Sequence, residues 1–419
     1  MKLPSPMNMP NAGARRVACA LLLLVFAAVP LVQAQQVAVR AETLYPMDGG
    51  GDAISDGVVL IEGGQIEAVG PASQVDVPSG YRVMETQVAT PGLVDARATV
   101  GMTSLANRSG QNDELDLTEA IQPGLRAFDA YNTRGRLVEF VQSLGVTTVN
   151  TGHAPGALVS GQTMVAKTEG SLDEAIVDSV AMVAMTLGPQ VSGNYDTPGT
   201  RSKGMALMRE TLLNAERYRE QRQNDNEEDD PPRKLRMDVL SEVLAGEVPA
   251  LITAQRASEI QSAMRLAERF GFDLVLSGAA ESYLLADEIA EAGVPVVLHP
   301  TMTRTGGETE NAAFTTAQTL MEAGVRVAIQ SGYEAYVPKT HVVLYEAAVA
   351  AGQGGLSRRQ ALRAVTIDAA RILGVADRVG SLEEGKDADL ALFDGDPLEY
   401  TTHTCGVLIG GEVVSEDCK

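Results

Sequence analysis

Two stretches of the chain, one after residue 35 and one near the end, alternate apolar and polar residues in short runs. Gly-rich turns such as Glu62-Gly63-Gly64 separate the runs, and this pattern predicts β-strands joined by tight turns. The expected strands are Val37–Ala41, Gly57–Glu62, Gln65–Val69 and Arg82–Thr86, then Leu390–Phe393, Gly406–Ile409 and Glu412–Val414. The simplest assembly joins residues 35–90 and 376–419 in one small β-sandwich.

Between these stretches, apolar strands alternate with amphipathic helices. The expected strands are Leu93–Ala96, Thr147–Asn150, Met164–Lys167, Ala181–Met185, Ala250–Thr253, Leu274–Leu276, Pro295–Leu298 and Arg326–Ile329. The expected helices are Thr118–Ser143, Ser202–Arg222, Ala257–Phe270, Glu281–Ala292, Ala313–Ala323, Thr340–Ala351 and Ser357–Leu373. Ser357 and Gln360 have the spacing of a capping box, which marks a helix start. This alternation predicts an α/β protein with a (β/α)8 TIM barrel over residues 91–375.

The N-terminus has the features of an export signal. Arg15 and Arg16 precede the apolar run Val17–Val32, and Val32-Gln33-Ala34 has the small-x-small pattern of a cleavage site. We therefore expect residues 1–34 to be a signal peptide, with an uncleaved membrane anchor as the alternative. The mature protein is then periplasmic or secreted and has no stable membrane association.

Two cysteines near the C-terminus fit such a compartment. Cys405 and Cys418 flank a predicted strand-turn-strand segment. An oxidising environment favours a disulfide between them, and two free thiols are the alternative.

Composition narrows the range of functions. The chain has 33 basic and 55 acidic side chains and a net charge of −22, which argues against nucleic acid or an anionic membrane surface as a partner. A small-molecule ligand or substrate is the expected partner. The four histidines are just enough for one histidine-rich metal site.

Two segments resemble those of a known family. Pro91-Gly92-Leu93-Val94-Asp95 is similar to the entry into the first barrel strand of the amidohydrolase superfamily. Val379-Gly-Ser-Leu-Glu-Glu-Gly-Lys-Asp-Ala-Asp-Leu-Ala-Leu392 is similar to that family's return from the barrel to the terminal sandwich. The nearest branch is the exported, imidazolonepropionase-like group. The resemblance implies a barrel of the metal-dependent hydrolase type, in which a bound metal activates water.

The residues that the resemblance assigns to the metal do not match the family pattern. The family uses a His-x-His pair on strand one, one histidine each after strands five and six, and an aspartate after strand eight. The residues found instead are Arg97 and Thr99 on strand one, Thr253 or Gln255 after strand five, Ser277-Gly278 after strand six and Gln330-Ser331-Gly332 after strand eight. Because arginine is permanently cationic, Arg97 would repel Zn²⁺. The sequence therefore predicts neither metal nor cofactor, and zinc is expected only if this assignment of ligand positions is wrong.

A replacement site at the barrel mouth is the remaining hypothesis. His153, His299 and Lys167 are its candidate catalytic groups, with a histidine as general base. Its candidate ligand-binding residues are Arg97, Thr99, Thr253, Gln255, Arg304, Glu308, Glu334 and Lys339. The alternative is that Arg97 pairs with Glu334 or Glu308 and that the two histidines are structural. His341 and His403 are interpreted as structural.

Two functions follow from these patterns. The first is an exported amidohydrolase-family protein without the family's metal centre, a catalytically silent barrel that binds a small ligand or a partner. If the partner is a protein, it is expected to be a second copy of the chain or a related amidohydrolase. The second is an active hydrolase of C–N bonds in amides, cyclic imides or dipeptide-like substrates, acting through a rearranged site.

Overall fold

The computed structural model describes residues 36–49, 53–105, 112–223, 232–302, 305–333 and 342–419. The predicted signal peptide lies outside these ranges. So do the candidates Arg304, Glu334, Lys339 and His341. No helix in the described ranges combines the length and apolar character needed to cross a membrane.

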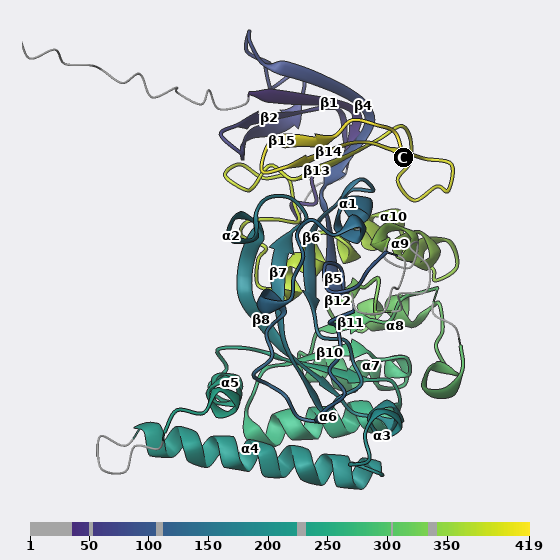
Figure 1. The fold of residues 1–419 in the computed structure, drawn as a ribbon. Helices are drawn as coiled ribbons and strands as arrows, with labels where there is room; N and C mark the ends of the chain where they lie inside the picture. Colours follow the sequence, from purple (N-terminus) through teal and green to yellow (C-terminus); the bar gives the residue numbers. More distant parts are fainter. Residues whose placement is uncertain (1–35, 50–52, 106–111, 224–231, 303–304, 334–341) are drawn as a thin grey trace, which may run out of the picture. The chain divides into compact units, whose positions relative to one another are not determined.

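Residues from both ends of the chain share one seven-stranded sheet, in the order β15-β14-β13-β4-β1-β2-β3 (Figure 1). Its strands are β1 (Val37–Leu44), β2 (Ile54–Glu62), β3 (Gln65–Pro71), β4 (Arg82–Pro91), β13 (Leu390–Phe393), β14 (Thr404–Ile409) and β15 (Glu412–Ser415). All seven terminal strands expected from the alternating pattern are thus confirmed. The two segments meet where β4 pairs with β13 in the antiparallel sense.

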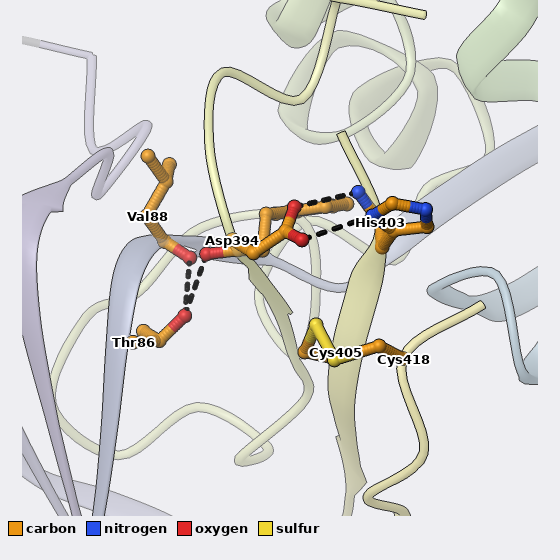
Figure 2. Close-up of a disulfide and its surroundings, with 7 residues drawn as sticks. Thr86, Val88, Asp394, His403, Cys405 and Cys418 are labelled. Atoms are coloured by element: carbon orange, nitrogen blue, oxygen red, sulfur yellow. Dashed lines mark hydrogen bonds and ion pairs between the residues drawn. A yellow bond between two sulfur atoms is a disulfide. The ribbon is translucent and has the colours of Figure 1, made fainter. Parts of the chain in front are cut away.

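A disulfide joins Cys405 on β14 to Cys418, which follows β15 (Figure 2). Beside it, the backbone N–H of His403 donates to Asp394 Oδ1 at 2.7 Å, and His403 Nδ1 lies 2.9 Å from Asp394 Oδ2. His403 therefore has a structural partner in the terminal sheet.

The second sheet has eight strands, in the order β12-β11-β10-β9-β8-β7-β6-β5. They are β5 (Leu93–Ala98), β6 (Val146–Gly152), β7 (Val159–Lys167), β8 (Ile176–Thr186), β9 (Ala250–Ala254), β10 (Leu274–Gly278), β11 (Val296–Leu298) and β12 (Val327–Ile329). A parallel bridge between Ala98 and Gly332 joins the two edges, so the sheet closes into a barrel. All eight predicted barrel strands are present.

Helices lie around the outside of this barrel (Figure 1). They are α1 (Arg136–Gln142), α2 (Leu172–Ala175), α3 (Pro189–Asn194), α4 (Arg201–Gln223), α5 (Leu235–Leu244), α6 (Ala257–Phe270), α7 (Ala286–Glu291), α8 (Thr316–Glu322), α9 (Val343–Gly352), α10 (Arg358–Ala364) and α11 (Ile367–Ile372), with 3-10 turns at Ala127–Asp129, Ser282–Leu285 and Gly307–Thr309. The predicted capping box at Ser357 is confirmed, because its hydroxyl accepts from the Gln360 N–H.

The predicted helix Thr118–Ser143 is wrong over most of its length. The segment consists of turns and the 3-10 turn Ala127–Asp129, with isolated bridges from Ile121 to Val159 and from Arg126 to Gln162 on β7. Only its end, α1, is an α-helix. Pro123-Gly124 and Gly135 explain the difference, since both residue types disfavour a helix interior.

One barrel strand runs opposite to its neighbours. β7 is antiparallel to both β6 and β8, because residues 153–158 are too few for a crossover connection. Lys167, at the end of β7, is therefore opposite Thr148 near the start of β6. The expectation that Lys167 lies at the barrel mouth is wrong, and Lys167 is at the other end of the barrel.

At that end Lys167 holds the barrel to the C-terminal return. Its ammonium pairs with Asp389 and lies 3.1 Å from Asp387 Oδ2. The Lys167 and Asp389 side chains are only 8% and 3% exposed, so the charges depend on each other for compensation. Removing one partner of a buried ion pair leaves an uncompensated charge.

We expect Lys167→Met to lower the free energy of unfolding by about 3–5 kcal/mol, measured by urea denaturation. The matched control is Arg126→Met, which removes the exposed Arg126–Asp129 pair and should cost at most about 1 kcal/mol. Equal losses in the two variants would contradict the role given to the buried pair.

Candidate functional site

The inside of the barrel is built in two layers. Val94, Leu251, Val275, Val297 and Ala328 belong to one buried apolar cluster, and each comes from a different strand. Side chains two residues apart on a strand share a face. Two residues further along the chain, the same face therefore carries Thr253 on β9 and Ser277 on β10, with His299 and Gln330 directly after β11 and β12. This polar layer lies toward the carboxyl ends of the parallel strands, where barrel proteins place their sites.

A bulge in β5 adds a cation to the polar layer. Asp95 is opposite Val149 and Ala98 is opposite Thr151, so two β5 residues, Ala96 and Arg97, oppose the single residue Asn150. Because Ala96 packs in the interior cluster, the bulge also turns Arg97 toward the interior.

The Arg97 side chain is almost completely enclosed. The residue is 1% exposed. Its Nη2 donates to the carbonyl oxygen of His153, whereas Nη1 has no hydrogen-bond partner among the described residues. Burial lowers the pKa of Arg97 to about 10, and nearby Tyr333 and Asp95 oppose the shift. The guanidinium still stays charged at neutral pH. Among the described residues, no carboxylate lies within ion-pair distance of it.

His153 follows β6 and is 5% exposed. Neither ring nitrogen reaches a partner at hydrogen-bonding geometry. Burial and the Arg97 charge lower its pKa to about 4, so the ring is neutral at pH 7. The ring lies against Gly161, where an added Cβ would come within 2.4 Å of His153 Cδ2 and where φ is +138°. Gly161 therefore provides both the space and the backbone conformation that the buried ring requires.

His299 follows β11 and is 3% exposed. Its Nδ1 lies 2.7 Å from the Pro300 carbonyl oxygen, so Nδ1 carries the proton and Nε2 is left as an acceptor. Nε2 has no partner in the described part of the chain. Burial lowers the pKa of His299, which keeps this imidazole neutral.

The family resemblance assigns several polar residues to the metal site. In this structure their side chains make hydrogen bonds with one another or with backbone groups. Gln330 Nε2 donates to the Val297 carbonyl at 2.9 Å and to Ser277 Oγ at 3.4 Å. Gln255 Oε1 accepts from the Ala280 N–H at 3.2 Å. The Thr99 hydroxyl lies 3.3 Å from that of Thr103. Thr253 is buried. These side chains are neutral, and within the described ranges no group of three His, Cys, Asp or Glu is arranged to hold a metal ion.

Glu308 is not near Arg97. It lies beside Gly188, and its pKa is raised by burial and by the neighbouring Glu259 carboxylate. The expected Arg97–Glu308 pair is therefore wrong. The alternative pair with Glu334 lies outside the described residues.

Asp95 is a site residue that the sequence reasoning missed, although it ends the quoted Pro-Gly-Leu-Val-Asp motif. It is fully buried, and its Oδ1 accepts from the N–H of Ser331 at 3.1 Å and from that of Arg97 at 3.2 Å. Burial raises its pKa to about 7. An acid inside an apolar strand was the signal that could have found it. Asn150 and Ser331 were also missed, and each has one unpartnered side-chain oxygen.

Residues 92–415 match the profile of the amidohydrolase family. The chain belongs to this family. It is 26% identical over 391 residues to an imidazolonepropionase of Sphingopyxis alaskensis, covering 83% of this chain and 88% of the relative. An imidazolonepropionase of Rhizobium rhizogenes is 25% identical over 398 residues, with 84% and 89% covered.

Two solved structures are similar as well. An amidohydrolase from Thermotoga maritima superposes with a TM-score of 0.85 at 27% identity, covering 91% of this chain and all of that one. The ochratoxinase of A. niger shares the fold, with a TM-score of 0.53 at 18% identity and coverage of 91% and 96%. The α/β barrel with a terminal sheet is thus the fold expected for the family.

The raised pKa of Asp95 predicts a pH-dependent stability. A carboxyl in the unfolded chain titrates near ~4. The folded state therefore binds this proton more tightly, and the free energy of unfolding falls as pH rises from about 4 to above 7. We expect Asp95→Asn to remove this loss, because asparagine keeps the acceptor for the two N–H groups and cannot ionise. The variant should gain on the order of 4 kcal/mol at pH 8 relative to pH 4.

The measurement is the melting temperature of the wild type and the variant between pH 4 and 8. The exposed carboxyl of Asp129, whose pKa is lowered by Arg126, provides the control Asp129→Asn, which should show no gain at high pH. A constant difference between wild type and Asp95→Asn across this range would contradict the prediction.

Proposed function

We propose that this chain is an exported member of the amidohydrolase family that works without the family's metal centre and binds a small molecule at the barrel mouth. Arg97 carries this proposal. The position that resemblance gives to the first metal ligand holds a buried, permanent cation instead of an imidazole. A cation there opposes a second positive charge in a region of low dielectric.

The other donors also fit a metal poorly. Zinc in proteins is bound by thiolate, imidazole or carboxylate groups, whereas hydroxyl and amide groups are weak substitutes. Ser277, Gln330 and Gln255 are such groups, and each already hydrogen-bonds within the protein. The chemistry of the family's metal therefore has no matching set of ligands in the described residues.

Export is the second part of the proposal. The basic residues, apolar run and small-x-small motif of residues 1–34 support a cleaved signal peptide and a periplasmic or secreted location. The disulfide between Cys405 and Cys418 is consistent with an oxidising compartment.

A second candidate function is hydrolysis of a C–N bond through a rearranged site. Its support is the neutral His299 ring, whose Nε2 is unpartnered and oriented by the Nδ1–Pro300 hydrogen bond. A neutral imidazole with a free nitrogen can accept a proton from water as a general base. The similarity to imidazolonepropionases also favours a small C–N substrate.

Elemental analysis of the mature protein, purified without chelators, tests the loss of the metal. We expect well under one zinc or other transition metal ion per chain, because the ligand positions hold a cation and neutral groups. One or more tightly bound ions per chain would overturn the proposal.

Hydrolysis of a panel of amides, cyclic imides and dipeptides separates the two functions. We expect no turnover above the solvent background. Turnover that falls at least ~100-fold in His299→Ala would instead establish the second function. The matched control is His403→Ala, because His403 pairs with Asp394 in the terminal sheet and is far from the polar layer in the fold.

A further inference from the structure

We propose that the ligand of this barrel is a small carboxylate and that the Arg97 guanidinium binds its carboxylate group. This inference rests on the proposed metal-free binding function and names the chemical class of the ligand.

The first argument is the uncompensated charge of Arg97. A buried charge is tolerated when it is paired, and an unpaired one is strongly destabilising. Arg97 is 1% exposed, and the only hydrogen-bond acceptor of its guanidinium in the described part of the chain is the His153 carbonyl. A neutral carbonyl satisfies one N–H but does not neutralise the cation. An anionic ligand would do so.

The second argument is the geometry of the unpartnered donor. Nη2 donates to the His153 carbonyl, which fixes the orientation of the guanidinium. Nη1 has no acceptor among the described residues, so its N–H groups remain available to a ligand. Guanidinium and carboxylate groups are planar and match in donor and acceptor spacing. A small planar carboxylate therefore matches this fixed donor.

The protein's own carboxylate does not fill this role. Asp95 follows the interior residue Val94 and so points to the other face of β5, where burial, and to a lesser extent the Glu346 carboxylate of α9, raises its pKa. Its Oδ1 is bonded to the N–H groups of Ser331 and Arg97, and it makes no ion pair with the guanidinium. The neighbouring imidazole of His153 is neutral and adds no competing charge.

The rest of the polar layer fits a ligand with a further polar group. Within the described ranges, His299 Nε2 and Asn150 Oδ1 are buried acceptors without partners. Buried polar atoms are normally paired with protein, water or a ligand. A small carboxylate that also carries an amide N–H would supply both the anion and a donor. The cluster with Leu251, Val275 and Val297 is apolar and offers such a ligand no hydrogen-bonding side chain, so the polar contacts come from the polar layer.

Calorimetric titration with two matched probes tests the inference. N-acetylglycine and N-acetylglycinamide differ only in the carboxylate. In chloride-free buffer we expect the acid to bind at least ~10-fold more tightly than the amide, which corresponds to the loss of a charge-assisted pair. Equal affinity, or absence of binding by both probes, would overturn the inference. Sodium chloride that displaces the acid at the acid's own concentration would show an inorganic anion site and would also overturn it.

Variants assign the effect to Arg97. Arg97→Met should lose the preference for the acid, and Arg97→Lys should keep a weaker one, because lysine retains the charge without the planar fork. The matched control is Arg82→Met, since Arg82 and its partner Glu416 are both about half exposed and belong to the terminal sheet region. If Arg97→Met does not fold, the comparison of wild type with Arg97→Lys decides. An unchanged preference in Arg97→Lys would contradict the planar-fork recognition.

Failure of this inference is distinguishable from failure of the proposed function. Elemental analysis reports the metal independently of any carboxylate. Absence of metal together with absence of acid binding overturns only the ligand class. Bound metal together with acid binding that disappears after chelation overturns both.

Discussion

The barrel closes where β5 meets β12, and the buried side chain of Asp95 accepts a hydrogen bond across that junction. Asp95 on β5 accepts the N–H of Ser331 just after β12, and the next N–H, that of Gly332, donates to the Arg97 carbonyl at 3.2 Å. This seam also contains the bulge that turns Arg97 inward. Closure of the sheet and placement of the interior cation therefore depend on the same few residues.

The seam has consequences for chemistry. A carboxylate that is needed to close the barrel cannot also neutralise a guanidinium on the other face of its strand. The interior therefore contains a charge that the described residues do not balance, surrounded by neutral imidazole, amide and hydroxyl groups. In water such a group would be solvated, but inside a barrel its stability depends on what binds there. The family fold is retained, and the binding site that we propose at its mouth offers a donor for an anion.

The amino-acid pattern predicted the strands well and the helices less well. Strands in a buried parallel sheet are continuous apolar runs, so all eight barrel strands could be recognised from the positions of apolar residues along the chain. The helix expected at Thr118–Ser143 failed because Pro123-Gly124 and Gly135 outweigh a helical spacing of apolar residues. The reversal of β7 was also missed. Its short connection after β6 was visible in the sequence, but the barrel template favoured a parallel strand and so placed Lys167 at the wrong end.

By itself the sequence determined the order of the strands, the family and the residues expected at the positions where the family binds metal, because these depend on local pattern and motif. Only the tertiary structure decided how those residues are paired. Whether Arg97 meets a carboxylate, whether His299 keeps a free nitrogen and whether Asp95 is buried all depend on contacts between strands far apart in the chain. Burial and pairing set the energy of a charge, and neither is a property of the residue alone.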